Sequence, residues 1–138
     1  MLEKKKISLK VIFVGLLLFV FDFFASIYFR SRGFGVLNTG ISFGIGSAQF
    51  GNYIAIFAFL VFVLWFGNEM RSSSCIRTSL YFLALGGLGN ILSRLIFGGV
   101  WDYICLSYLP FCFNVSDVLI SLGVVSYILE VDGNRRTV

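Results

Sequence analysis

Hydrophobic residues are gathered in four long runs, which short polar or glycine-rich segments separate. The runs cover about residues 11–29, 52–67, 79–97 and 113–129. An α-helix rises about 1.5 Å per residue and the hydrocarbon core of a bilayer is ~30 Å thick, so such runs are typical of transmembrane helices. The pattern predicts an all-α integral membrane protein with four transmembrane helices, forming a single membrane domain over residues 1–138.

The segment 33–51, between the first two runs, breaks this pattern. It is rich in glycine, and its apolar residues partly alternate with small ones. Short alternating stretches between glycines are typical of strands and turns rather than of a membrane span. We therefore expect a small strand-like lip at the membrane surface over residues 33–51.

Composition supports a membrane protein and excludes several kinds of catalysis. Of 138 residues, 58% are hydrophobic and 13% are charged, and a soluble fold of this size could not bury so much apolar surface. The chain has no histidine, which excludes Ser-His-Asp and Cys-His catalysis and removes the commonest metal ligand. We expect no metal and no other cofactor.

The positions of the basic residues predict the orientation in the membrane. With four spans, both termini and the link 68–78 lie on one side. That side holds Lys4, Lys5, Lys6, Lys10, Arg71, Arg77, Arg135 and Arg136, and the other side holds Arg30, Arg32 and Arg94. The richer side is cytoplasmic by the positive-inside rule. We therefore expect cytoplasmic termini and an extracytoplasmic lip. The net charge of +4 follows from this placement and does not indicate nucleic-acid binding, so we expect membrane lipid and no nucleic acid among the partners.

Polar side chains gather where the third run ends and the fourth begins. They are Asn90, Ser93, Arg94, Asp102, Asn114, Ser116 and Asp117. Each of them alone could cap a helix, but polar and ionisable groups at the mouth of a span are costly and mark candidate sites. Asp102 and Asp117 suggest aspartic protease chemistry, in which one acid of a close pair keeps a proton and the other is ionised.

Two other features leave alternatives open. Asp22, near the end of the first run, is either an interfacial acid facing the arginines that follow or a hydrogen-bonding partner inside the bundle. Cys75, Cys105 and Cys112 have no zinc-type spacing. Cys105 and Cys112 could pair in an oxidising compartment, but we expect free thiols.

Four short motifs resemble the sequence boxes of the lipoprotein signal peptidase family, the type II signal peptidases of bacteria. They are residues 38–43 (NTGISF, compared with NxGxxF), 89–94 (GNILSR, with GNxxDR), 100–103 (VWDY, with VxDF) and 113–117 (FNVSD, with FNxAD). Asp22 also matches an Asp in the family's first span. The family usually has a lysine four residues later, where this chain has Ser26.

The resemblance implies a membrane aspartic endopeptidase that removes signal peptides from diacylglyceryl-modified prolipoproteins at the outer face of the bacterial cytoplasmic membrane. It implies a catalytic pair at the Asp positions of GNxxDR and FNxAD, which are Ser93 and Asp117 here. Asp102 would substitute for the first acid if its loop brings it within reach of Asp117. The positions implied in shaping the site and binding substrate are Asn38, Gly40, Asn90, Arg94 and Asn114.

Ser93 leaves two functions open. A serine without a neighbouring base cannot act as a nucleophile, and every lysine lies on the predicted cytoplasmic side. The chain is then either a signal peptidase or a non-catalytic relative that binds lipidated peptides or a membrane partner. A transporter subunit is disfavoured because the acids cluster near one membrane face rather than at the midplane.

The predicted orientation can be tested with reporter fusions. A reporter at the C-terminus should score as cytoplasmic and one within residues 98–110 as extracytoplasmic, because the charge bias lies in short loops, where the rule is most reliable. Paired fusions of alkaline phosphatase and green fluorescent protein would measure this. The reverse pattern would contradict the orientation.

Overall fold

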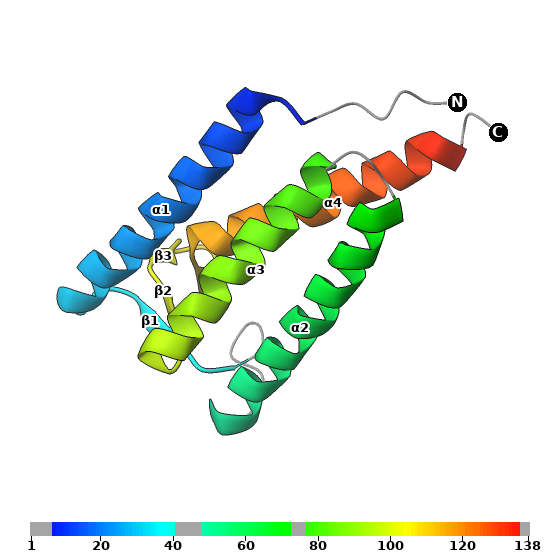
Figure 1. The fold of residues 1–138 in the computed structure, drawn as a ribbon. Coiled ribbons are helices and arrows are strands. Elements are labelled where there is room, and N and C mark those ends of the chain that lie inside the picture. The colour runs from blue at the N-terminus through cyan, green and yellow to red at the C-terminus, as the bar shows by residue number, and fades with distance from the viewer. Residues whose placement is uncertain (1–6, 41–47, 73–76, 136–138) are drawn as a thin grey trace.

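The computed structural model describes residues 7–40, 48–72 and 77–135. The described residues form four helices, α1 (Leu9–Ser31), α2 (Ala48–Ser72), α3 (Thr78–Phe97) and α4 (Val115–Arg135). They also form four short strands, β1 (Val36–Asn38), β2 (Val100–Asp102), β3 (Ile104–Cys105) and β4 (Cys112–Phe113). Figure 1 shows α3 in the middle of the molecule, with α1 and α2 on either side and α4 packed along it.

The predicted hydrophobic runs coincide with the helices, which confirms a mainly helical membrane protein. Within the described ranges, three helical segments are long and apolar enough to cross a membrane, namely Leu9–Ser31, Phe50–Glu69 and Thr78–Phe97. Helix α4 is not among them; it carries Asp117 in its first turn and Glu130 near its other end.

The predicted lip over 33–51 is wrong at its end, because residues 48–51 belong to helix α2. Gly51 suggested a loop, but here it allows close packing. A Cβ atom on Gly51 would lie 2.5 Å from the carbonyl oxygen of Thr39, so the chain after β1 lies directly against this helix. Residues 41–47 of the lip lie outside the described residues.

The strands connect the lip to the loop between α3 and α4, where the sequence predicted no strand. Strand β1 pairs antiparallel with β2, so that Val36 lies opposite Asp102 and Asn38 opposite Val100. Helix α3 ends at Gly98, whose φ of 74° is the left-handed conformation that glycine adopts readily, and β2 begins two residues later.

The expectation of free thiols is wrong for two of the three cysteines. Cys105 of β3 and Cys112 of β4 face each other in an antiparallel pair with a Cα–Cα distance of 4.3 Å, and they form a disulfide. The register of this hairpin, which the sequence does not reveal, brings the sulfur atoms together. Cys75 lies outside the described residues.

Glycines allow α3 and α4 to pack closely. A Cβ atom on Gly86 would lie 2.5 Å from the carbonyl oxygen of Ser116, and one on Gly89 would overlap the Ser116 hydroxyl. Small residues at such contacts are how membrane helices approach each other without a hydrophobic driving force. The start of α4, which carries the polar residues of the fourth motif, is therefore fixed against α3.

Gly89→Ala should disturb the start of α4. The added methyl group overlaps Ser116, and overpacking of this kind costs roughly 1–3 kcal/mol. We expect a thermal midpoint several degrees lower in detergent, measured by intrinsic tryptophan fluorescence. Gly67→Ala is the control, because nothing lies within 4 Å of a Cβ atom at that helical glycine. Equal effects of the two substitutions would contradict the packing argument.

Candidate active site

Asp102 and Asp117 come together because β2 ends beside the first turn of α4. Asp102 is 4% exposed. The side-chain amide of Asn114 donates a hydrogen bond to Asp102 Oδ1 at 3.0 Å, and the backbone N–H of Asn114 donates to Asp117 Oδ2 at 3.2 Å. One residue therefore contacts both carboxylates.

The helix-capping interpretation of Asn114 and Asp117 is also correct. The Asn114 side-chain oxygen accepts a hydrogen bond from the backbone N–H of Asp117 at 2.8 Å, and Asp117 accepts the reciprocal bond from Asn114. This is the arrangement of a capping box. It holds the Asp117 side chain at the helix start and leaves Oδ1 of the same carboxylate for a second partner.

Two further asparagines complete the hydrogen bonds to the acids. Asn90 of α3 donates to Asp117 Oδ1 at 2.8 Å and accepts from the Asn114 side-chain amide at 3.2 Å. Asn38 of β1 donates to Asp102 Oδ2 at 3.0 Å. Both carboxylates are thus oriented by neutral amides from different elements.

Arg94 connects the lip to two helices and adds positive charge near the acids. Its guanidinium donates to the side-chain oxygen of Asn52 at 2.6 Å and to the carbonyl oxygen of Gly40 at 2.7 Å. Gly40 in turn donates its backbone N–H to the side-chain oxygen of Asn38 at 3.0 Å. The arginine is 7% exposed, and its charge attracts both Asp102 and Asp117.

The surroundings of Asp102 favour its protonated form. The pKa of Asp102 is raised to about 6; burial is the main cause, and the negative charge of Asp117 acts in the same direction. Hydrogen bonds from Asn38 and Asn114 and the charge of Arg94 oppose this increase, because they favour the ionised form. Asp102 can therefore hold a proton at mildly acidic pH, as one member of an aspartic pair must.

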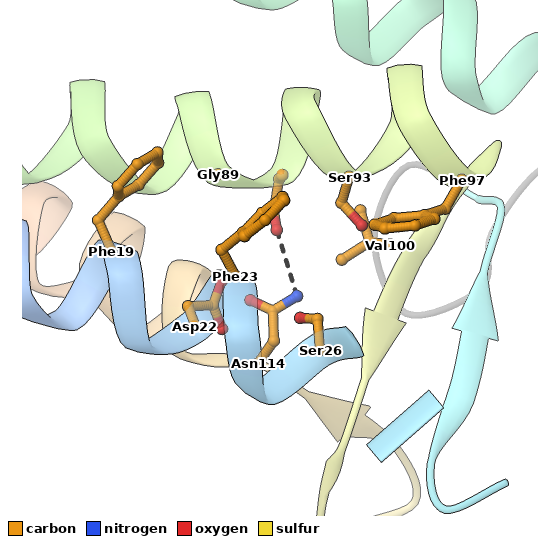
Figure 2. Close-up of a pocket in the computed structure, with 10 residues that line it drawn as sticks. Phe19, Asp22, Phe23, Ser26, Gly89, Ser93, Phe97, Val100 and Asn114 are labelled. Atoms are coloured by element: carbon orange, nitrogen blue, oxygen red, sulfur yellow. Dashed lines mark hydrogen bonds between the residues drawn. The ribbon is translucent and has the colours of Figure 1, made fainter. Parts of the chain in front are cut away.

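Ser93 lies in a different environment from the two acids. It is 8% exposed, and its hydroxyl donates to the carbonyl oxygen of Gly99 at 3.0 Å. It lines a small cavity together with Asp22, Ser26 and Asn114 (Figure 2). Of the two positions predicted as partner for Asp117, Asp102 shares the amide network with Asp117, whereas Ser93 bonds to the loop.

Asp22 is a hydrogen-bonding partner inside the bundle, which decides between its two interpretations. Its Oδ1 accepts from the Tyr103 hydroxyl at 2.7 Å and from the backbone N–H of Val115 at 2.9 Å. Its Oδ2 accepts from the Ser116 hydroxyl at 2.5 Å. The first helix is thereby fixed to residues adjacent to each of the two acids.

Sequence reasoning missed two residues of this arrangement. Asn52 accepts from Arg94 and donates to the carbonyl oxygen of Gly98 at 2.7 Å, which fixes α2 to the end of α3. Its position at the polar start of a hydrophobic run was the available signal. Tyr103 directly follows Asp102, and burial followed by the neighbouring Asp22 raises the pKa of its phenol, which therefore remains a donor.

A large cavity of about 820 Å³ adjoins the acids. Apolar side chains of α2, α3 and α4 form most of its wall, and Asn38, Asn90, Arg94, Asp102 and Asp117 also line it. The apolar wall includes Ala55, Ala58, Phe59, Phe62, Leu83, Ile91, Val118, Leu122 and Val125. The cavity can hold an apolar ligand of considerable size with a bond to be cleaved beside two carboxylates.

The chain is similar to proteins of one family. The family model described as signal peptidase (SPase) II matches residues 32–131. The lipoprotein signal peptidase of Mesorhizobium japonicum is 35% identical over 111 residues, which are 75% of this chain and 66% of that protein. The lipoprotein signal peptidase of Anaplasma marginale is 36% identical over 103 residues, 70% of this chain and 61% of that one. The chain thus spans less than two thirds of the length of these relatives.

Solved structures of a bacterial membrane enzyme, determined by the in meso method, share the fold. The structure at 2.3 Å resolution has a TM-score of 0.68 and 22% identity, and covers 98% of this chain and 94% of the other. The structure at 1.9 Å resolution has a TM-score of 0.64 and the same identity. Because the family model extends over most of the chain, from the lip to α4, the chain belongs to the signal peptidase II family.

Proposed function

We propose that this chain is an aspartic endopeptidase that removes signal peptides from diacylglyceryl-modified prolipoproteins, with Asp102 and Asp117 as its catalytic pair. The observation that carries the proposal is the Asn114 side chain and backbone, which contact both carboxylates at the wall of a large apolar cavity. Family membership supplies the class of substrate.

The proposed reaction uses the two acids in different protonation states. Ionised Asp117 takes a proton from a water molecule, whose oxygen attacks the carbonyl carbon of the scissile peptide bond. Protonated Asp102 donates its proton to the carbonyl oxygen. The tetrahedral intermediate then collapses: the C–N bond breaks, the proton held by Asp117 passes to the leaving amine, and one hydroxyl of the intermediate returns its proton to Asp102 as the new carboxyl group forms.

The remaining site residues hold this pair in place. Asn38, Asn90 and Asn114 direct N–H groups at the carboxylates, which fixes their orientation without removing the proton from Asp102. Arg94 and Gly40 join the start of the lip to the bundle. The apolar wall of the large cavity takes the lipid chains and the apolar signal peptide.

The proposal includes four membrane spans, with α4 as the fourth. The acids of α4 that the structure describes lie near its two ends, so the stretch between them is apolar. The start of α1 and the end of α4 lie at the same end of the molecule in Figure 1, away from the strands, as an even number of spans requires. Both termini are then cytoplasmic, and the site faces outward from the bacterial cytoplasmic membrane.

Asp102→Asn and Asp117→Asn should each reduce cleavage by roughly 1,000-fold or more, because removing one member of a cooperating catalytic group typically has an effect of this size. The assay is gel-shift cleavage of a purified diacylglyceryl-modified prolipoprotein in detergent. Glu130→Gln, an acid-to-amide change at the other end of α4, is the control.

Two outcomes would contradict the catalytic pair. Normal cleavage by Asp102→Asn would exclude Asp102 as the partner of Asp117. An inactive parent chain that still binds the lipidated substrate would favour a non-catalytic relative.

The cleavage rate should decline as the pH rises through about 6, because Asp102 then loses the proton that it donates. Asn38→Ala should move this alkaline limb to higher pH. The Asn38 amide stabilises the ionised form, so its removal raises the pKa of Asp102 further. Cleavage rates measured between pH 4.5 and 8.5 for the parent, Asn38→Ala and the exposed control Asn68→Ala would locate the alkaline limb in each protein. A limb that moves to lower pH in Asn38→Ala would refute the argument.

A further inference from the structure

A second cavity lies beside Asn90 and Asn114. It has a volume of about 10 Å³, which is room for about one water molecule. Helices α1 and α3 run on either side of it in Figure 2, and its polar lining comes from Asp22, Ser26, Asn90, Ser93 and Asn114. Two of these residues, Asn90 and Asn114, are the amides that hold Asp102 and Asp117.

The two serines are the places where the sequence departs from the charged positions of the family motifs. A lysine is usual at the position of Ser26 and an aspartate at that of Ser93, so two opposite charges are replaced by two hydroxyls. The structure places both serines on the same small cavity, at 7% and 8% exposure. Because both changes meet in one place, they leave its net charge unaltered.

The hydroxyls have hydrogen-bonding capacity directed at this space. The Ser93 hydroxyl donates its proton to the carbonyl oxygen of Gly99, so the lone pairs of the hydroxyl oxygen can still accept hydrogen bonds. Ser26 is 7% exposed, and Figure 2 shows its hydroxyl beside Asn114 at the cavity. Buried polar groups nearly always have a partner, and a water that fills a small polar cavity usually makes two to four hydrogen bonds.

We propose that Ser26 and Ser93 bind one water molecule and with it form a polar pocket that positions Asn90 and Asn114. Ser93 is then a positioning residue rather than a damaged catalytic group. The effect of this pocket on catalysis rests on the proposed function. The existence of the pocket does not depend on that function.

An aspartate at position 93 should harm this pocket. Its ionised carboxylate would lie in a closed space near Asp22, and it could not donate to Gly99 as the serine does. A buried charge without a partner is strongly destabilising. Replacing both serines with alanine is different, because it adds no charge, and the second alanine removes a partner of a water that the first alanine has already weakened.

Four variants test the proposal, namely Ser26→Ala, Ser93→Ala, their combination and Ser93→Asp, with Ser31→Ala on the exposed end of α1 as the control. Thermal midpoints in detergent are measured together with kcat and KM for a diacylglyceryl-modified prolipoprotein. We expect the two alanine effects to be non-additive, with the double variant no worse than the more affected single one. Ser93→Ala should lower kcat several-fold and leave KM unchanged.

Ser93→Asp should lower the midpoint by at least ~5 °C and should not increase cleavage. Increased cleavage by Ser93→Asp, or strictly additive alanine effects, would overturn the proposal. So would a crystal structure with ordered waters that shows none between the Ser26 and Ser93 oxygens. If the chain cleaves no prolipoprotein at all, the proposed function fails, while the midpoints and the ordered water still decide whether the pocket exists.

Discussion

The whole arrangement depends on holding two carboxylates, Asp102 buried and Asp117 partly buried, in a protein whose solvent is largely lipid. An ionised carboxylate taken out of water is very unfavourable unless hydrogen bonds or opposite charges compensate it. Here the donors are amides from β1, α3 and the start of α4, through Asn38, Asn90 and Asn114. A lysine or arginine bonded directly to Asp102 would compensate more strongly, but it would also hold the pKa of that carboxyl low. Neutral donors stabilise the pair and still let Asp102 keep a proton.

The same requirement explains why Arg94 bonds to other groups. Its guanidinium donates to Asn52 and Gly40, so it acts on the carboxylates through its field and not through a direct hydrogen bond in this structure. In doing so it fixes the lip and α2 to α3. Together with Asp22, which connects α1 to the start of α4, the polar network reaches every helix. Association of membrane helices relies on packing and polar contacts, and in this chain the contacts that build the site also hold the bundle together.

The helices are predictable from the sequence. A chain in lipid must satisfy its backbone hydrogen bonds within each span, so a long apolar run of this kind forms an α-helix. The strands were not, because segments of two or three residues such as Ile104–Cys105 carry no periodic signal and depend on a distant partner. The expectation of free thiols fails for the same reason, since the disulfide follows from the register of β3 and β4. At the end of the lip, Gly51 suggested a turn, whereas close packing against Thr39 requires glycine within a helix.

The sequence indicates which residues belong to the candidate site, but not which of them is the partner of Asp117. Motif resemblance identified Asn38, Asn90, Asn114 and Asp117, all of which contact one another or Asp102. The choice between Ser93 and Asp102 as the partner of Asp117 depends on which face of α3 points to the loop and on how β2 pairs with β1. Both are tertiary features, and the sequence spacing alone leaves them undetermined.

The burial of Asp102 also affects the stability of the fold. Its pKa of about 6 exceeds the ordinary value of 3.8, so between these values the folded chain binds more protons than the unfolded one. Stability contributed by this group therefore rises as the pH falls from about 6 toward 4, and is lost as the pH rises through about 6. A difference of about two pKa units corresponds to roughly 3 kcal/mol, a sizeable part of the free energy of unfolding of a typical domain. The proton that the proposed reaction needs is thus the same proton that relieves the burial of Asp102, and the amide network serves to make the ionised state tolerable once that proton has been donated.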